Sequence, residues 1–246
     1  NTFTDSSTNA HTITRNGNVT QGSFSPYGDN WSNYFDGSSS LKFNSSGDYN
    51  LGVGDFTIEG WFYKTASTAS QTIVSSGSYY TAGANGNWVL RITSATQIAF
   101  ATYNGTGNEE YSEFSAATSL NTWHHFALVR EGTGTNQTKF YLDGVLAGSM
   151  TVSKSLSDGS VNGIYIGSDG AGPNNDFNGY LSNVRILTAT ALYTSGFTPP
   201  TSPLTTISNT EFLSAASNRF IDEAIGGTIT ISGTPKVTPF SPFKNN

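Results

Sequence analysis

Apolar and polar residues alternate along most of this chain, in short runs separated by turn residues. The run Asp55–Lys64 is typical, because Phe56, Ile58 and Phe62 point to one face of an extended strand and Trp61 and Tyr63 to the other. Glycine and asparagine, which tolerate positive φ, lie between the runs. The pattern predicts many short strands and no long helix. Strands are expected at Ser40–Asn44, Asp55–Lys64, Thr72–Ser76, Trp88–Ile92, Ile98–Tyr103, Trp123–Arg130, Lys139–Leu146, Gly163–Gly167 and Gly179–Leu187.

The close and even spacing of these strands is typical of an all-β sandwich or barrel. Composition agrees: the chain has 246 residues, of which 13% are aromatic and only 11% charged, so Ser, Thr, Asn and Gly must solvate the surface. These small polar residues disfavour helices, and the aromatic content argues against disorder. One large β-rich domain, with or without an appendage, fits this length.

The two ends of the chain carry the same motif. The motif has three blocks: Phe-x-Asp begins at Phe3 and again at Phe220, Thr-Ile-Thr occupies 12–14 and again 228–230, and Phe-Ser-Pro begins at Phe24 and again at Phe240. The offset between the two copies is 216 or 217 residues. Fixed-period similarity is a mark of arrays, although two similar β-ribbons in one domain would give it too. We therefore expect three parts: a junction motif at 1–32, a jelly roll at 33–205 and a second junction at 206–246. Assembly contacts are expected at Phe3, Phe24, Phe220, Phe240 and Phe243.

Charge and cysteine content exclude several classes. The net charge is −6 and the basic residues are scattered, so nucleic-acid binding is not expected. No run approaches the ~20 apolar residues of a membrane span, so membrane insertion is not expected either. With 0 Cys there is no disulfide framework, a composition that suits bacterial surfaces and virus particles.

Five segments, in order, resemble laminin G-like modules of the concanavalin A-like lectin/glucanase superfamily. They are Tyr34–Gly37, Leu51–Phe62, Thr122–Arg130, Phe140–Gly144 and Phe177–Ile186. The resemblance covers roughly Asn33–Pro203 and implies a two-sheet antiparallel jelly-roll sandwich. The flanking motifs resemble linkers between such modules in phage tail and virion proteins. Members of this superfamily bind glycans, protein partners or calcium, and some are glucanases, so the site must decide the function.

Aromatic residues beside polar ones indicate a glycan site, because a sugar ring needs an apolar platform and a few groups that fix its orientation. Aromatic residues in a sandwich more often pack its core. The pair of tyrosines in the loop 77–86 is the least suited to a core position. The candidate glycan-binding residues are Tyr79, Tyr80, Trp88, Arg91, Tyr103 and Asn104.

Calcium is the metal that best fits the sequence, because the loop 168–177 is rich in carboxylate, amide and carbonyl oxygens. The resemblance also implies calcium at a sheet rim. Asx turns in an ordinary loop would use the same residues. The candidate ligands are Asp36, Asp169, Asn175 and Asp176.

Catalysis is not expected. A glycosidase needs two carboxylates that face each other across a groove, and glucanases of this superfamily place them on one strand as Glu-x-Asp-x-x-Glu. The acidic cluster at 109–113 has different spacing and is interpreted as a solvated loop.

These observations predict a non-enzymatic binding module of a virion appendage or extracellular assembly, with a glycan or cell-surface ligand and neighbouring copies of itself as partners. A purely structural spacer or filament subunit without a small ligand is the alternative. A glycan-degrading enzyme is the third possibility.

Overall fold

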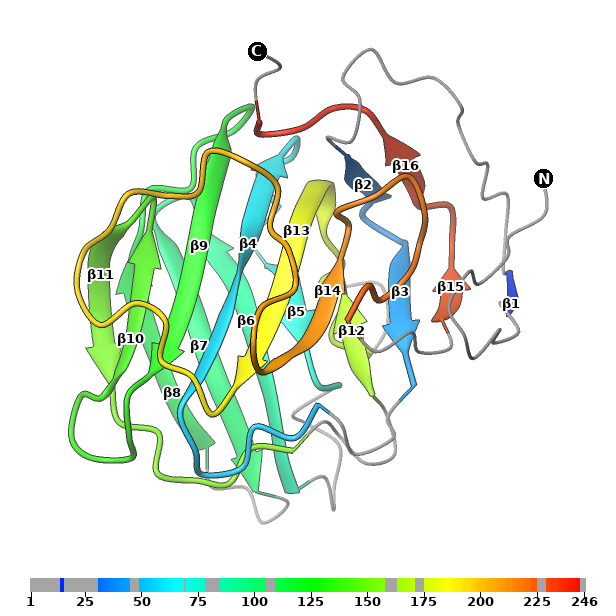
Figure 1. Cartoon of the computed structure of the whole chain (residues 1–246). Helices are drawn as coiled ribbons and strands as arrows, with labels where there is room; N and C mark the ends of the chain where they lie inside the picture. Colours follow the sequence, from blue (N-terminus) through cyan, green and yellow to red (C-terminus); the bar gives the residue numbers. More distant parts are fainter. Residues whose placement is uncertain are drawn as a thin grey trace.

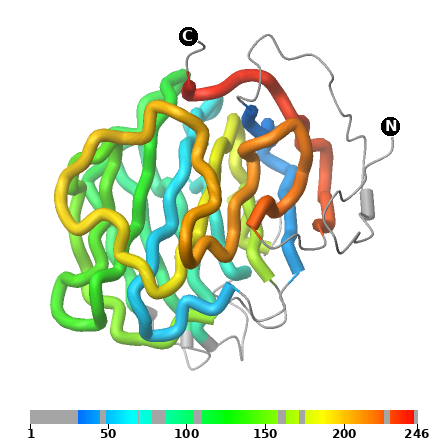
Figure 2. The backbone as a smooth tube through the Cα atoms, viewed as in Figure 1, coloured from blue at the N-terminus to red at the C-terminus, as the bar shows by residue number. Residues whose placement is uncertain are grey.

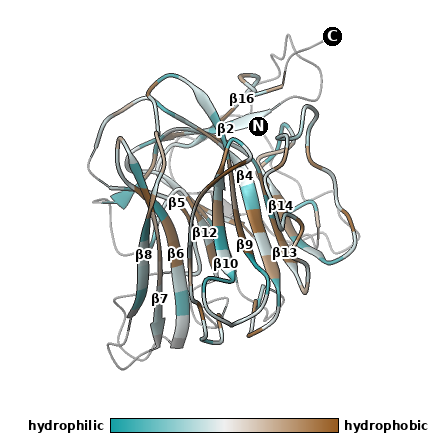
Figure 3. Cartoon of the chain, turned by 90° about the vertical axis from the view of Figure 1, so that its left-hand side faces the viewer, coloured by the Kyte–Doolittle hydropathy of each residue, from teal (hydrophilic) through white to brown (hydrophobic). Residues whose placement is uncertain are grey.

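The chain folds into a sandwich of two β-sheets, seen from the front in Figure 1 and from the side in Figure 3. The computed structural model describes residues 14–15, 31–44, 49–68, 70–77, 85–104, 109–157, 163–170, 175–224 and 229–243. Among these residues there is no α-helix, and every strand pairing except one is antiparallel. The all-β jelly-roll sandwich expected from the sequence is confirmed. No helix among the described residues is long and apolar enough to cross a membrane.

The rear sheet, called sheet A, has the strand order β1-β15-β3-β12-β5-β6-β7-β8. The parallel pair is β1–β15 at its edge. Its strands are β1 (Thr14–Arg15), β15 (Ile229–Ser232), β3 (Ser40–Phe43), β12 (Ile164–Ile166), β5 (Gln71–Ser75), β6 (Asn85–Ser94), β7 (Gln97–Asn104) and β8 (Glu109–Ser115).

The front sheet, called sheet B, has the order β11-β10-β9-β4-β13-β2-β16, and β14 pairs with β13. Its strands are β11 (Val145–Met150), β10 (Thr138–Leu142), β9 (Trp123–Arg130), β4 (Phe56–Lys64), β13 (Asn178–Thr188), β2 (Ser32–Asp36), β16 (Lys236–Thr238) and β14 (Thr210–Ser214).

The core lies between the sheets and is built by the period of two along each strand. In β6 the side chains of Trp88, Leu90 and Ile92 are fully buried in it, and β4 contributes Phe56, Ile58 and Phe62 in the same way. Figure 3 shows hydrophobic and hydrophilic bands along the strands of both sheets. Removal of this apolar area from water is the main force that holds the layers together.

The C-terminal part belongs to this sandwich. β14 and β16 add to sheet B, β15 adds to sheet A, and Phe212, Ile231 and Val237 are buried in the common core. The boundary predicted at residue 205 therefore does not separate two packed units in the described structure. The C-terminal copy of the repeated motif completes both sheets, and its role as a junction to a further module stays a prediction.

Residues 189–209, called the strap, cross the outer face of sheet B and are drawn in gold and orange in Figures 1 and 2. The amide of Leu204 donates to the side chain of Asn183 on β13, over 2.8 Å, and the amide of Phe197 donates to Gly144 O, over 3.0 Å. The strap thus closes much of this face.

A charged network is buried under the strap. Glu59 on β4 accepts hydrogen bonds from Arg185 on β13 and, over 2.9 Å, from the hydroxyl of Tyr193 in the strap, while His125 Nε2 lies 3.4 Å from its carboxylate. Burial opposes ionisation of Glu59, but contact with His125 and Arg185 outweighs it and lowers the pKa of Glu59. The same burial, together with the charge of Glu59, raises the pKa of Tyr193. The strap therefore seals an ionic cluster in which both oxygens of Glu59 accept hydrogen bonds.

The C-terminal segment covers the upper end of the same face. The ring of Phe240 lies 4.8 Å from the rings of both Tyr63 and Tyr180 and stacks on Trp123 at 5.4 Å, measured between centroids. Phe243 packs edge-on against Trp61 at 5.6 Å. Sheet B is thus closed on its outer side by two segments from the last quarter of the chain.

One predicted loop is a strand. Residues 109–115 form β8 at the edge of sheet A, so the interpretation of the acidic cluster as a loop is wrong. An edge strand is solvated on one side, and charged residues are common there because they hinder pairing with other chains.

Candidate functional site

One straight row of residues crosses the outer face of sheet A. The strand registers align Lys42 of β3 with Tyr165 of β12, then continue through β5, β6 and β7 to Tyr111 of β8. All of these side chains point away from the core, because their neighbours along each strand point into it. The row consists of Thr230, Lys42, Tyr165, Ser75, Val89, Ala101 and Tyr111.

The middle of this row is closed and its two ends are accessible. Ser75, Val89 and Ala101 have no exposed surface, and Tyr103 packs over the last two. Tyr111 at the far end is 45% exposed. At the near end Lys42 and Tyr165 are half-buried and line an open hollow.

This hollow, called the Tyr165 hollow, has a volume of about 400 Å³. The ammonium of Lys42 lies over the tyrosine ring, 5.3 Å from its centroid. The hollow thus combines one aromatic ring, one cation and a rim of hydroxyl groups, which are groups that hold polar ring-shaped ligands. It is lined by Ser38, Ser40, Lys42, Tyr165, Ser168, Gly170, Asp176, Thr230 and Ser232.

Three predicted calcium ligands gather beside this hollow, close enough for their charges to interact. Burial raises the pKa of Asp176 to about 6, and the negative charges of Asp169 and Asp36 add to this effect, while a hydrogen bond from Ser168 opposes it. Asp176 Oδ1 is buried and has no hydrogen-bond partner. The protein therefore stabilises the ionised form of Asp176 poorly.

The other predicted ligands already have partners inside the protein. Asp36 accepts hydrogen bonds from Ser38, Ser39 and Thr234, which outweigh its burial and lower its pKa to about 2. Asn175 donates to Asp169 over 2.9 Å. No three His, Asp or Glu side chains within the described ranges converge as a metal site. Calcium also accepts backbone carbonyl and side-chain amide oxygens as ligands, so its binding at this loop stays a prediction.

The predicted glycan residues are divided between the two sides of sheet A. Arg91 and Tyr103 lie on the outer face, as a ligand site would require. Trp88 is wrong as a sugar platform, because it faces the core with no exposed surface. Asn104 ends β7. Tyr79 and Tyr80 lie outside the described residues.

Lys42 and Tyr165 were missed by reasoning from the sequence. Alternation in Ile164-Tyr165-Ile166 does place the tyrosine opposite two core residues. Its pairing with Lys42, 123 positions earlier, depends on strand register, which no local pattern gives.

Two of the predicted assembly residues are part of the fold. Phe220 is 2% exposed within the core and Phe243 is 6% exposed against Trp61, so neither presents a surface to another chain. Phe240 is 37% exposed within its ring cluster. Phe3 and Phe24 lie outside the described residues. Self-association stays a prediction.

Comparison with known proteins gives one family and a set of distant structures. The family model for the concanavalin A-like lectin/glucanases superfamily matches residues 35–192. Among curated proteins none matches.

The solved structures share the fold at low sequence identity. A candidate carbohydrate binding protein from Bacteroides ovatus has a TM-score of 0.58 and 19% identity, over 88% of this chain and 62% of that one. A heptameric SAP-like pentraxin from Limulus polyphemus has a TM-score of 0.49 and 16% identity, over 83% and 95%. The CBM40 of a Ruminococcus gnavus IT-sialidase has a TM-score of 0.49 and 17% sequence identity, over 66% of this chain and 93% of that one.

Proposed function

The chain belongs to the concanavalin A-like lectin/glucanase superfamily, and from this premise we propose that it is a non-catalytic carbohydrate-binding module whose ligand site is the Tyr165 hollow. The observation that carries the proposal is the half-buried pair of Tyr165 and Lys42 at the open end of sheet A. The similar structure from Bacteroides ovatus is of a candidate carbohydrate binding protein, which supports the proposal that this chain binds carbohydrate.

The groups of the hollow match the needs of a sugar. The tyrosine ring offers an apolar face for C–H groups, and the rim offers hydroxyl groups from Ser40, Thr230 and Ser232. In a complex, Lys42 would donate hydrogen bonds to the sugar, and Asp176 Oδ1, which has no partner within the protein, would accept one from a sugar hydroxyl. A site with unpaired polar groups around one apolar surface fixes the orientation of a ligand as well as binding it.

A binding role is preferred to hydrolysis because of how the carboxylates are used. Glycoside hydrolysis needs an acid and a second carboxylate on opposite sides of the bond. Beside the hollow, Asp36 and Asp169 hold hydrogen bonds within the protein. Asp176 alone among these three keeps an oxygen without a partner, which suits ligand binding better than two-carboxylate chemistry.

The test is a broad glycan array probed with the wild-type chain, with Tyr165→Ala and with Val145→Ala. Val145 is 70% exposed on sheet B and serves as the matched control. We expect defined positives for the wild type and the control, and loss of about tenfold or more in affinity for Tyr165→Ala, which is about 1.4 kcal/mol. A blank array would remove the proposal and favour a purely structural spacer. Unchanged binding by Tyr165→Ala would remove the Tyr165 hollow as the ligand site and place glycan binding elsewhere on the chain.

The proposal extends to calcium and to the setting of the protein. Calcium would bind at Asp176, and repeating the array in chelator separates calcium-dependent from calcium-independent recognition.

A virion appendage or an extracellular surface is the proposed location, supported by the lack of cysteine and by the polar, weakly charged surface. Immunolabelling of intact particles or cells with an antibody to this chain tests that location.

A further inference from the structure

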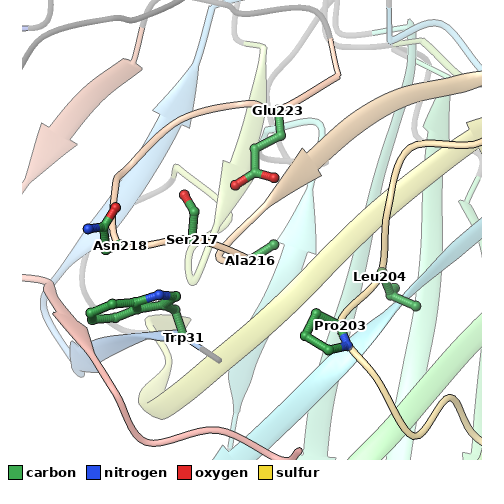
Figure 4. A pocket seen from close by; sticks show the side chains of 7 residues that line it. All are labelled: Trp31, Pro203, Leu204, Ala216, Ser217, Asn218 and Glu223. Atoms are coloured by element: carbon green, nitrogen blue, oxygen red, sulfur yellow. The ribbon is translucent and has the colours of Figure 1, made fainter. Parts of the chain in front are cut away.

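A second hollow lies on the other side of the molecule, next to the outer face of sheet B. Figure 4 shows it between Trp31 at the start of β2 and Pro203 in the strap, with the loop after β14 above it. Its volume is about 340 Å³, at the small end of the range for small-molecule sites. It is called the Trp31 hollow and is lined by Trp31, Pro203, Leu204, Ala216, Ser217, Asn218 and Glu223.

One part of the hollow is apolar. Leu204 and Ala216 belong to a small cluster that is separate from the main core, and Pro203 extends it towards the solvent. Trp31 is 7% exposed and rests on the main core, so only a limited part of its indole reaches the hollow. The apolar surface of the hollow is thus formed mainly by Pro203, Leu204 and Ala216, with a limited contribution from Trp31.

The other part is polar and acidic. Ser217 Oγ is buried and has no hydrogen-bond partner, although such atoms in proteins nearly always have one. Asn218 and Glu223 are exposed, and in Figure 4 both lie on the same rim of the hollow as Ser217. Glu223 is the one charged side chain among the described residues that line the hollow.

We propose that the Trp31 hollow is a second ligand site, for the ring of a neutral sugar. The apolar surface would take the C–H face of the ring, while Ser217, Asn218 and Glu223 would bond its hydroxyl groups. The carboxylate of Glu223 repels anionic sugars such as uronic or sialic acids. This site is independent of the Tyr165 hollow and faces the opposite way, so one chain can hold two glycans on opposite sides.

The test is a titration followed by NMR of the tryptophan indole N–H signals in the full chain, which has 4 Trp. The probes are the methyl β-glycosides of glucose, galactose and N-acetylglucosamine, with methyl β-glucuronide as the anionic counterpart. Trp31→Phe identifies the Trp31 signal by its loss. Asn218→Ala removes one rim donor at an exposed position, and Ser208→Ala, on the exposed strap outside the hollow, is the control.

We expect at least one neutral glycoside to shift the Trp31 signal with saturation in the millimolar range, and the glucuronide to bind at least fivefold more weakly. Asn218→Ala should weaken binding at least fivefold, and Ser208→Ala and Tyr165→Ala should leave it within twofold. Glu223→Lys should reverse the preference in favour of the glucuronide. No shift with any neutral glycoside, or an equal shift in Asn218→Ala, would overturn the proposal whether or not the Tyr165 hollow binds.

Discussion

The outer faces of the two sheets start from the same alternating strands and end in opposite states. On sheet B the outward residues include Glu59, Trp61 and His125, and the strap and C-terminal segment bury them. On sheet A the outward residues include Lys42, Tyr165 and Tyr111, which stay accessible. Outward charge and aromatic character are therefore not enough to mark a site. What matters is whether another segment of the chain covers the outward side chains or leaves them accessible to a ligand.

The largest expected effect is at the sealed ionic network. Glu59→Ala leaves Arg185 buried without its carboxylate partner, so we expect the free energy of unfolding to fall by about 3–5 kcal/mol in urea titrations. Lys139→Ala is the control, because it breaks an accessible ion pair with Glu131 worth at most about 1 kcal/mol. Equal losses in the two variants would mean that the strap does not exclude water from Glu59.

A smaller effect is expected where the C-terminal segment covers sheet B. Phe240→Ala removes one partly exposed ring from contact with three others, and we expect a loss of about 1–2 kcal/mol in unfolding free energy. The melting temperature measured by calorimetry checks this, with Val145→Ala expected to change stability by less than about 0.5 kcal/mol. An unchanged melting temperature for Phe240→Ala would show that the segment does not hold this face closed.

The smallest effect is expected beside the accessible hollow, and it has the opposite sign. Folding raises the pKa of Asp176 from 3.8 to about 6, so its ionisation destabilises the folded state above pH 6, and this penalty disappears as the pH falls below 4. Asp176→Asn should therefore stabilise the protein at pH 7 by about 1 kcal/mol, a value reduced for solvent screening, and should have no effect at pH 4.

Urea titrations in chelator at the two pH values measure this difference without bound calcium. A stability gain that is equal at pH 4 and pH 7 would show that the effect does not come from ionisation of Asp176. Loss of stability in Asp176→Asn at pH 7 would show that the carboxylate has a partner in solution.

The strands were predictable because their periodicity is local. β9 was expected at Trp123–Arg130 and has those bounds, and alternation in β6 groups Trp88 with Leu90 and Ile92, a set that already indicates a core face. β8 was missed because an edge strand rich in glutamate resembles a loop when only its composition is considered.

The sites were less predictable because their residues are distant in the sequence. The Trp31 hollow joins the start of β2 to loops near residues 203 and 218, and the Tyr165 hollow joins β3, β12 and β15. Strand register and the path of the strap bring these residues together, and neither leaves a local pattern. The same distance explains why the role of the C-terminal motif in closing both sheets was not predicted.

The most direct test of the contrast between the two faces is the affinity of one array-positive glycan for the wild type, Tyr165→Ala and Phe240→Ala, measured by calorimetry at a temperature where all three are folded. We expect Tyr165→Ala to bind about tenfold or more weakly while keeping its stability, and Phe240→Ala to lose stability while binding within about twofold of the wild type. Loss of binding in Phe240→Ala with full binding in Tyr165→Ala would contradict the assignment and place the ligand on sheet B.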